Sequence, residues 1–206
     1  MMDVDLNGLV LAGGKSKRMR RDKGLLRYRG RAQRYYLADM LRKYCGQVFI
    51  SCRPDQNKAI VHAGYNTLPD DGQAEEQYGA ILSALTAYPN TAWLVIACDM
   101  PMMDGEALTY LIAQRDSSMI ATAYAGPDNG LPEPLSAIWE PRSRGTLLDK
   151  LSQGVTCPRK ALIRSAPDVK LVAPRDPLIV MNANTPGDAA AARQIIRQSG
   201  TASRVI

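Results

Sequence analysis

The sequence predicts an α/β protein, a single Rossmann-like domain with a mostly parallel sheet and helices on both faces. Short apolar runs alternate with segments of helical spacing along the chain, and that alternation is typical of such a sheet. Residues 93–97 are unbroken and apolar, as in a central strand buried on both faces. The length of 206 residues suits one domain, which we assign to residues 1–206 with a core of about 6–198.

The elements of the first half follow from apolar runs and helical spacing. A buried strand over residues 6–12 ends in Gly13 and Gly14, and a long basic loop spans residues 15–31. Leu37, Met40, Leu41 and Tyr44 recur at helical spacing within a helix at 32–44. Next come a strand at 48–52, a helix at 55–63, a strand at 65–68, a helix at 78–88 and the central strand at 93–98.

The second half continues the alternation. Pro101 ends the central strand, and Gly154 ends a helix at 142–153. Pro186 starts the C-terminal helix, with Thr185 as its cap. The other predicted elements are a helix at 105–115 and strands at 119–124, 135–139 and 178–181.

Composition excludes several classes of protein. No apolar run approaches the roughly 20 residues that span a bilayer, so we expect no membrane association. The N-terminal residues lack the layout of a signal peptide, and we place the protein in the cytoplasm. The four cysteines form no C-x-x-C pair, which disfavours a zinc site and predicts buried free thiols.

The positive charge is concentrated in residues 15–34. The only acidic residue there is Asp22, so the stretch carries +9 and the rest of a +6 chain carries −3. The ten cations are Lys15, Lys17, Arg18, Arg20, Arg21, Lys23, Arg27, Arg29, Arg31 and Arg34. Such a cluster indicates a local anionic partner, with a solvated surface as the alternative. The chain has no RNA-binding motif or aromatic stacking platform, so we expect no nucleic acid.

Two segments lie at the carboxyl ends of predicted strands, where parallel sheets bind ligands. Gly13 and Gly14 permit positive φ and let backbone N–H groups approach an anion, although a plain tight turn would also use them. Arg18 and Lys23 on the adjoining loop can grip a triphosphate. Asp99, after the buried central strand, suits magnesium, with a helix cap or turn as the alternative.

Two further pairs of polar residues end strands. Asp70 and Asp71 follow the third strand and could accept hydrogen bonds from a guanine or ribose, or could form a turn. Asn182 and Asn184 end the last predicted strand, where Asn184 could equally be a turn residue.

Four segments together resemble the molybdenum cofactor guanylyltransferase family of the nucleotidyltransferase superfamily. The family signature LAGGxSxRMGxDKxLL is matched by LAGGKSKRMRRDKGLL over residues 11–26. CDxPxL is matched by CDMPM at 98–102, PEPLxAxY by PEPLSAIW at 132–139, and NxNTPED by NANTPGD at 182–188. Order and spacing agree from residue 6 to about residue 198.

This resemblance implies transfer of GMP from GTP to the phosphate of molybdopterin, with Mg²⁺ as cofactor and a cofactor-delivery protein among the expected partners. Asp99 would hold the magnesium, and Arg18 and Lys23 would hold the phosphates of GTP. Asp70 would contact the base or ribose, and Asn182 and Asn184 would face the pterin or the metal. The backbone that would cradle GTP is that of Leu11, Ala12, Gly13 and Gly14.

The chain also departs from the family pattern. The glycine after RM is Arg20, the G-P-x-x-G segment reads EQYGA over residues 76–80 and lacks that glycine and proline, and the acidic residue after N-T-P is Gly187. LAGG rather than LAAG favours a guanylyltransferase over a cytidylyltransferase, a choice that depends on Gly13. Two alternatives stay open: a cytidylyl- or sugar-phosphate nucleotidyltransferase, and a catalytically degenerate nucleotide-binding homologue.

Overall fold

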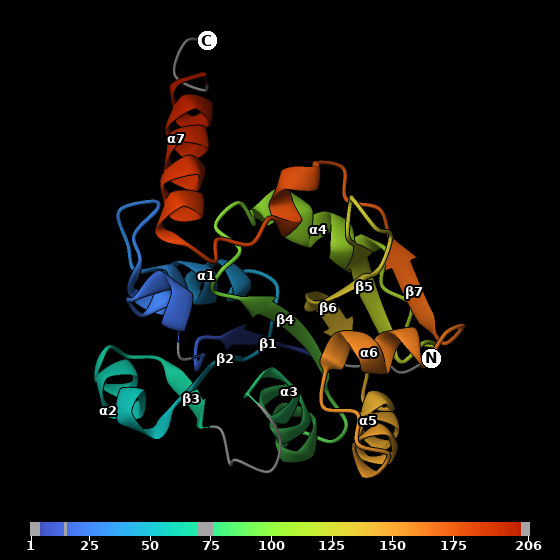
Figure 1. Ribbon diagram of the computed structural model, residues 1–206. Coiled ribbons are helices and arrows are strands. Elements are labelled where there is room, and N and C mark those ends of the chain that lie inside the picture. The colour runs from blue at the N-terminus through green and yellow to red at the C-terminus, as the bar shows by residue number, and fades with distance from the viewer. Residues whose placement is uncertain (1–4, 15, 70–75, 203–206) are drawn as a thin grey trace.

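The computed structural model describes residues 5–14, 16–69 and 76–202, which form a seven-stranded sheet flanked by helices (Figure 1). The strand order is β3-β2-β1-β4-β6-β5-β7. The strands are β1 (Leu6–Leu11), β2 (Val48–Cys52), β3 (Asn66–Pro69), β4 (Ala92–Ala97), β5 (Ala121–Ala125), β6 (Pro132–Trp139) and β7 (Val169–Val172).

The sheet is mostly parallel. β1 pairs in parallel with β2 and β4, β2 with β3, and β5 with β7, whereas β6 runs antiparallel to β4 and β5. The carboxyl ends of β1, β2 and β4 therefore meet at one edge of the sheet, and β6 begins at that same edge. The predicted fold class is confirmed.

Helices cover both faces of the sheet, as predicted. In Figure 1, α1 and α4 lie on one face, and α3, α5 and α6 lie on the other. The helix α2 packs beside β2 and β3, and α7 projects away from the sheet. The helices are α1 (Gln33–Leu41), α2 (Pro54–His62), α3 (Glu76–Ala87), α4 (Gly105–Ala113), α5 (Ser143–Ser152), α6 (Pro158–Ile163) and α7 (Pro186–Ala202).

One predicted strand is wrong. Residues 178–181 belong mainly to a 3-10 helix, η3 (Pro177–Val180), because Pro177 sets a helical φ and the carboxylate of Asp176 accepts a hydrogen bond from the backbone N–H of Leu178. Ile179 and Val180 are buried in this helix, which gives it the apolar run of a strand. The sequence reading also left α6 and β7 unassigned, because both are short.

The basic loop contains two short 3-10 helices, η1 (Lys17–Met19) and η2 (Lys23–Leu25). All four cysteines are free, but only Cys52 and Cys98 are buried. The prediction of buried thiols is therefore wrong for Cys45 and Cys157, which are partly exposed. Within residues 5–14, 16–69 and 76–202, no helix is long and apolar enough to cross a membrane.

Candidate active site

A cavity of about 250 Å³ opens at the carboxyl ends of β1, β2 and β4. The sequence had predicted a ligand site at this edge of the sheet. Its lining residues come from the strand ends, the glycine turn, the basic loop, α3 and the segment before α7. They are Leu11, Gly13, Gly14, Ser16, Arg18, Lys23, Ser51, Gln77, Ala80, Ala97, Cys98, Asp99 and Asn184.

Three predicted side chains meet at the ammonium group of Lys23. Lys23 Nζ lies 3.1 Å from Asp99 Oδ2 and donates a 2.7 Å hydrogen bond to Asn184 Oδ1. Arg18 also donates to Asn184 Oδ1, at 3.2 Å. The side chains of Lys23 and Asp99 are each 15% exposed, so their charges interact largely out of solvent. The structure thus brings together four residues from three distant parts of the chain.

The second carboxylate oxygen of Asp99 suits a cation. Asp99 Oδ1 is buried and has no hydrogen-bond partner among the described residues, an arrangement that is costly unless a ligand occupies it. Among the described residues the Asp99 carboxylate accepts a hydrogen bond from Lys23 and none from a backbone N–H, so the helix-cap alternative is wrong, whereas Asp99 does lie in the turn that follows β4. Within the described ranges no three His, Cys, Asp or Glu side chains cluster, so an ion here would take its other ligands from phosphates and water.

Asp22 fixes the direction of Lys23. Its carboxylate caps η2 by accepting a hydrogen bond from the backbone N–H of Gly24 at 2.8 Å. Gln56 at the start of α2 donates to the same carboxylate at 2.7 Å, and Arg34 of α1 lies 3.5 Å from it. The basic loop is therefore anchored to two helices, and the residue after the anchor faces the cavity.

Asn184 is held by contacts on both sides. The backbone N–H of Ala183 donates a 2.7 Å hydrogen bond to the backbone carbonyl of Asp99, which ties this segment to the end of β4. The Asp188 carboxylate accepts from the N–H groups of Asn184 and Thr185, and these bonds lower its pKa. Thr185 Oγ1 accepts from Asp188 N, so the predicted Thr185 cap is confirmed. Asp188 thus supplies an acidic group beside the position where the family has one and this chain has Gly187.

The glycine turn differs from the expectation in its backbone. Gly13 and Gly14 are absent from the described residues with positive φ, so the prediction that these glycines serve a positive φ is wrong. Both line the cavity, and a Cβ added at Gly14 would meet nothing within 4 Å. Positive φ occurs instead at Ser16 and Arg20, with values of 48° and 56°. Arg20, which replaces a family glycine, therefore keeps a backbone conformation that favours glycine.

The remaining predicted residues have different surroundings. Ala12 is absent from the lining; its N–H donates to Ser51 O and its carbonyl accepts from Gln56. The side-chain amide of Asn182 donates to Val180 O, and Asn182 also does not line the cavity. Asp70 and Asp71 lie outside the described residues.

The cations of residues 15–34 have two kinds of surroundings. Arg18 and Lys23 line the cavity, whereas three others bind elsewhere in the fold. Arg29 donates to Pro101 O, Arg31 pairs with Asp39, and Arg34 pairs with Asp22. Those three cations position the loop and α1 rather than a ligand.

Three polar lining residues were not among the predicted site residues, namely Ser16, Ser51 and Gln77. Ser51 is 3% exposed near the carboxyl end of β2, a position that the parallel topology could have marked. Gln77 lies in the first turn of α3, in the segment where the family has G-P-x-x-G.

Cys98 also faces the cavity, beside Asp99. Burial raises the pKa of its thiol, and the neighbouring Asp99 carboxylate adds to the increase. The thiol therefore stays protonated near neutral pH, and a covalent mechanism through Cys98 is disfavoured.

Comparisons with known protein sequences found matches that cover most of the chain. A family model described as "MobA-like NTP transferase domain" matches residues 8–169. A Synechocystis relative named "Molybdenum cofactor biosynthesis bifunctional protein" is 38% identical over 89% of this chain. An Ectopseudomonas mendocina relative named "Molybdenum cofactor guanylyltransferase" is 26% identical over 89% of this chain. The chain covers 52% of the first relative's length and 90% of the second's.

Solved structures share the fold. Molybdopterin-guanine dinucleotide biosynthesis protein A from Archaeoglobus fulgidus is 22% identical with a TM-score of 0.76, covering 93% of this chain and 99% of its own. A nucleotidyl transferase from Methanothermobacter thermautotroptrophicus is 16% identical with a TM-score of 0.76, covering 95% and 99%. At these identities the likeness concerns the fold.

Proposed function

Because the chain belongs to the MobA-like NTP transferase domain family and is a nucleotidyltransferase, we propose that it transfers GMP from GTP to the phosphate of molybdopterin. The product is the guanine dinucleotide form of the cofactor, and pyrophosphate is released. The observation that carries the proposal is the Lys23–Asp99 pair, with a carboxylate oxygen left unpaired beside a glycine turn and two cations.

In the proposed reaction an oxygen of the molybdopterin phosphate attacks the α-phosphorus of GTP. A new P–O bond forms there, the bond to the β-phosphate bridging oxygen breaks, and its electron pair leaves with pyrophosphate. This transfer needs no protein nucleophile, since positioning and charge neutralisation supply most of the catalysis. Lys23 and Arg18 offset the negative charge that builds on the departing pyrophosphate.

Asp99 is the residue that would hold magnesium, through the oxygen that lacks a protein partner. When bound, the ion would neutralise charge on the phosphate oxygens. Asn184 holds Lys23 and Arg18 beside each other, which keeps both cations at the mouth of the phosphate site.

Pyrophosphate release with molybdopterin and magnesium, measured separately for GTP, CTP and UTP, tests the proposal. Release from GTP far above the other nucleotides is expected. Preference for CTP or UTP would instead support the cytidylyl- or sugar-phosphate alternatives. Tight GTP binding without pyrophosphate release would support a degenerate homologue. Delivery of the product to a partner protein remains part of the proposal.

A further inference from the structure

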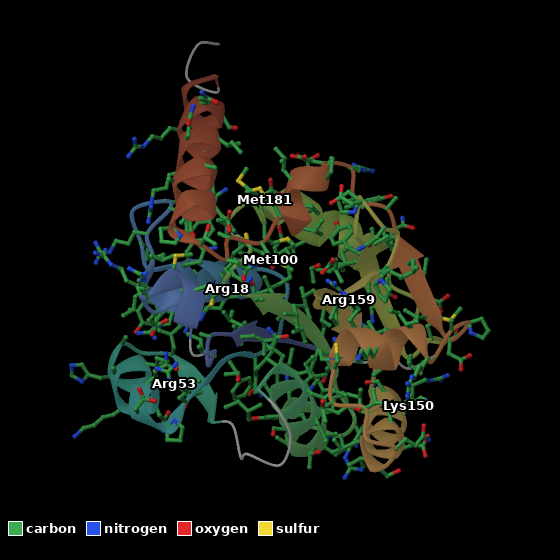
Figure 2. All side chains as sticks on the ribbon, viewed as in Figure 1. Arg18, Arg53, Met100, Lys150, Arg159 and Met181 are labelled. Carbon is green, nitrogen blue, oxygen red and sulfur yellow. The ribbon has the colours of Figure 1, made fainter. Side chains whose placement is uncertain are left out.

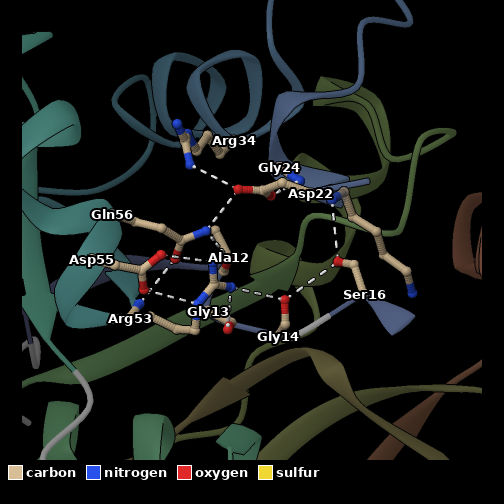
Figure 3. Close-up of polar contacts among 11 residues, drawn as sticks. Ala12, Gly13, Gly14, Ser16, Asp22, Gly24, Arg34, Arg53, Asp55 and Gln56 are labelled. Atoms are coloured by element: carbon tan, nitrogen blue, oxygen red, sulfur yellow. Dashed lines mark hydrogen bonds and ion pairs between the residues drawn. The ribbon is translucent and has the colours of Figure 1, made fainter. Parts of the chain in front are cut away.

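Arg53, the residue before α2, contacts the backbone of the glycine turn. Its guanidinium donates hydrogen bonds to the backbone carbonyls of Gly13 at 3.0 Å and Gly14 at 3.2 Å (Figure 3). It is also paired with Asp55 through two contacts of 3.0 and 3.1 Å. Arg53 does not line the cavity, and Figure 2 shows it at α2, whereas Arg18 comes from the basic loop.

Gln56 makes a similar contact with the preceding peptide. Gln56 Nε2 lies 3.4 Å from the carbonyl of Ala12, and Gln56 Oε1 accepts from the backbone N–H of Arg53 at 2.9 Å. Three consecutive carbonyls, those of Ala12, Gly13 and Gly14, thus face side chains from the start of α2 (Figure 3).

These contacts set the direction of the N–H groups. In a trans peptide the C=O and N–H bonds point in opposite directions, and the peptides of this turn are trans. With the carbonyls of Ala12 and Gly13 held toward α2, the N–H groups of Gly13 and Gly14 point away from it. Neither N–H has an acceptor among the described residues, and both glycines line the cavity. Successive N–H groups that converge in this way form a site for anions.

We propose that Arg53 is a positioning residue for the phosphate chain of a nucleoside triphosphate. It holds the glycine turn so that the N–H groups of Gly13 and Gly14 remain directed at the phosphates, while Asp55 holds Arg53 in place. The inference rests on the proposed function only for the class of ligand, and it does not depend on which base the enzyme selects.

The test compares Arg53→Ala and Arg53→Lys with a matched control, Arg42→Ala. Arg42 likewise pairs with an aspartate, Asp39, and donates to a glycine carbonyl, Gly64 O, but lies outside the cavity lining. Calorimetric titration without acceptor gives the Kd for GTP and for inorganic triphosphate, and steady-state assays give KM and kcat. Thermal melts check folding.

For Arg53→Ala we expect Kd for both ligands and KM for GTP to rise about tenfold, with kcat changed little, because charge-assisted contacts that orient the donors are lost. Arg53→Lys should recover part of the loss, since a lysine reaches one carbonyl as a point charge. If Arg53→Ala does not fold, the affinities of Arg53→Lys decide the test. Arg42→Ala should stay within about twofold of the wild type, because its contacts lie outside the site.

Three results would overturn the assignment of Arg53. The first is that Arg53→Ala leaves the affinities for GTP and inorganic triphosphate unchanged. The second is a loss of affinity no larger than in Arg42→Ala. The third is weaker GTP binding with unaltered affinity for inorganic triphosphate. If the wild-type protein binds triphosphate but transfers no guanylyl group, the proposed function fails while the comparison of Arg53 variants still decides this inference.

Discussion

Replacing Asp99 with asparagine should separate catalysis from folding. The amide oxygen of asparagine can still accept the hydrogen bond that Lys23 Nζ now donates at 3.1 Å. The variant loses the negative charge and the oxygen that has no partner. We expect Asp99→Asn to fold normally and to lose magnesium-dependent turnover, and Asp99→Ala to behave alike.

The expected magnitudes follow from these contacts. Removing the negative charge leaves the ammonium of Lys23, which is only 15% exposed, without its counter-charge, and breaking a buried pair in this way costs about 3 kcal/mol. The neutral amide that replaces the carboxylate costs less to keep buried than an unpaired charged oxygen, which offsets part of that cost. Stability should therefore fall by about 1–3 kcal/mol. Loss of the cation ligand should slow turnover roughly 10³-fold, equivalent to about 4 kcal/mol of barrier.

Pyrophosphate release and urea unfolding measure the two quantities on the same preparations. Asp104→Ala is the control, because Asp104 caps α4 by accepting from Ala107 N and lies outside the cavity lining. It should lose about 1 kcal/mol of stability and keep its turnover. Wild-type rates in Asp99→Asn, or a turnover loss matched by unfolding, would refute the reasoning.

Two other substitutions test the loop and the segment before α7. Arg20 has a φ of 56°, so Arg20→Gly should be more stable than Arg20→Ala by about 1 kcal/mol in urea unfolding, the reverse of the usual order. Asp188 accepts backbone hydrogen bonds that lower its pKa from 3.8. Its contribution to the stability of the fold is therefore fully present above pH 3.8 and is lost as the pH falls through the lowered pKa of the folded state. Asp188→Ala should therefore melt below the wild type at pH 7, and the difference should vanish in strong acid; a difference independent of pH would contradict this.

Local pattern predicted most of the fold because alternation of apolar runs and helical spacing reflects burial directly. Residues 48–52 coincide with β2, and Pro186 begins α7 as expected. The segment at 178–181 was misassigned because a buried 3-10 turn and a short buried strand present the same apolar run. The antiparallel direction of β6 was also beyond the sequence, since no residue in 132–139 specifies its partner.

The candidate site was predictable where one residue followed a strand, as with Asp99, and where motif spacing marked Lys23, Arg18 and Asn184. The sequence could not show the contacts among them, which join residues 76 to 166 positions apart. The sequence also could not indicate the role of Arg53, because its hydrogen bonds to backbone carbonyls depend on the orientation of the backbone and leave no pattern of residue types.

The charged side chains that line the cavity lead to one more prediction, on the affinity for GTP without magnesium. Among the described lining residues, Arg18 and Lys23 are positive and only Asp99 is negative. In the absence of a cation, the Asp99 carboxylate repels the phosphates of an entering nucleotide and competes with them for Lys23. Asp99→Asn should therefore bind GTP more tightly than the wild type when magnesium is chelated, by about two- to tenfold at low salt. With magnesium present the order should reverse. Equal affinities without magnesium would mean that the carboxylate does not face the phosphate chain, and Asp99 could then not be the cation ligand.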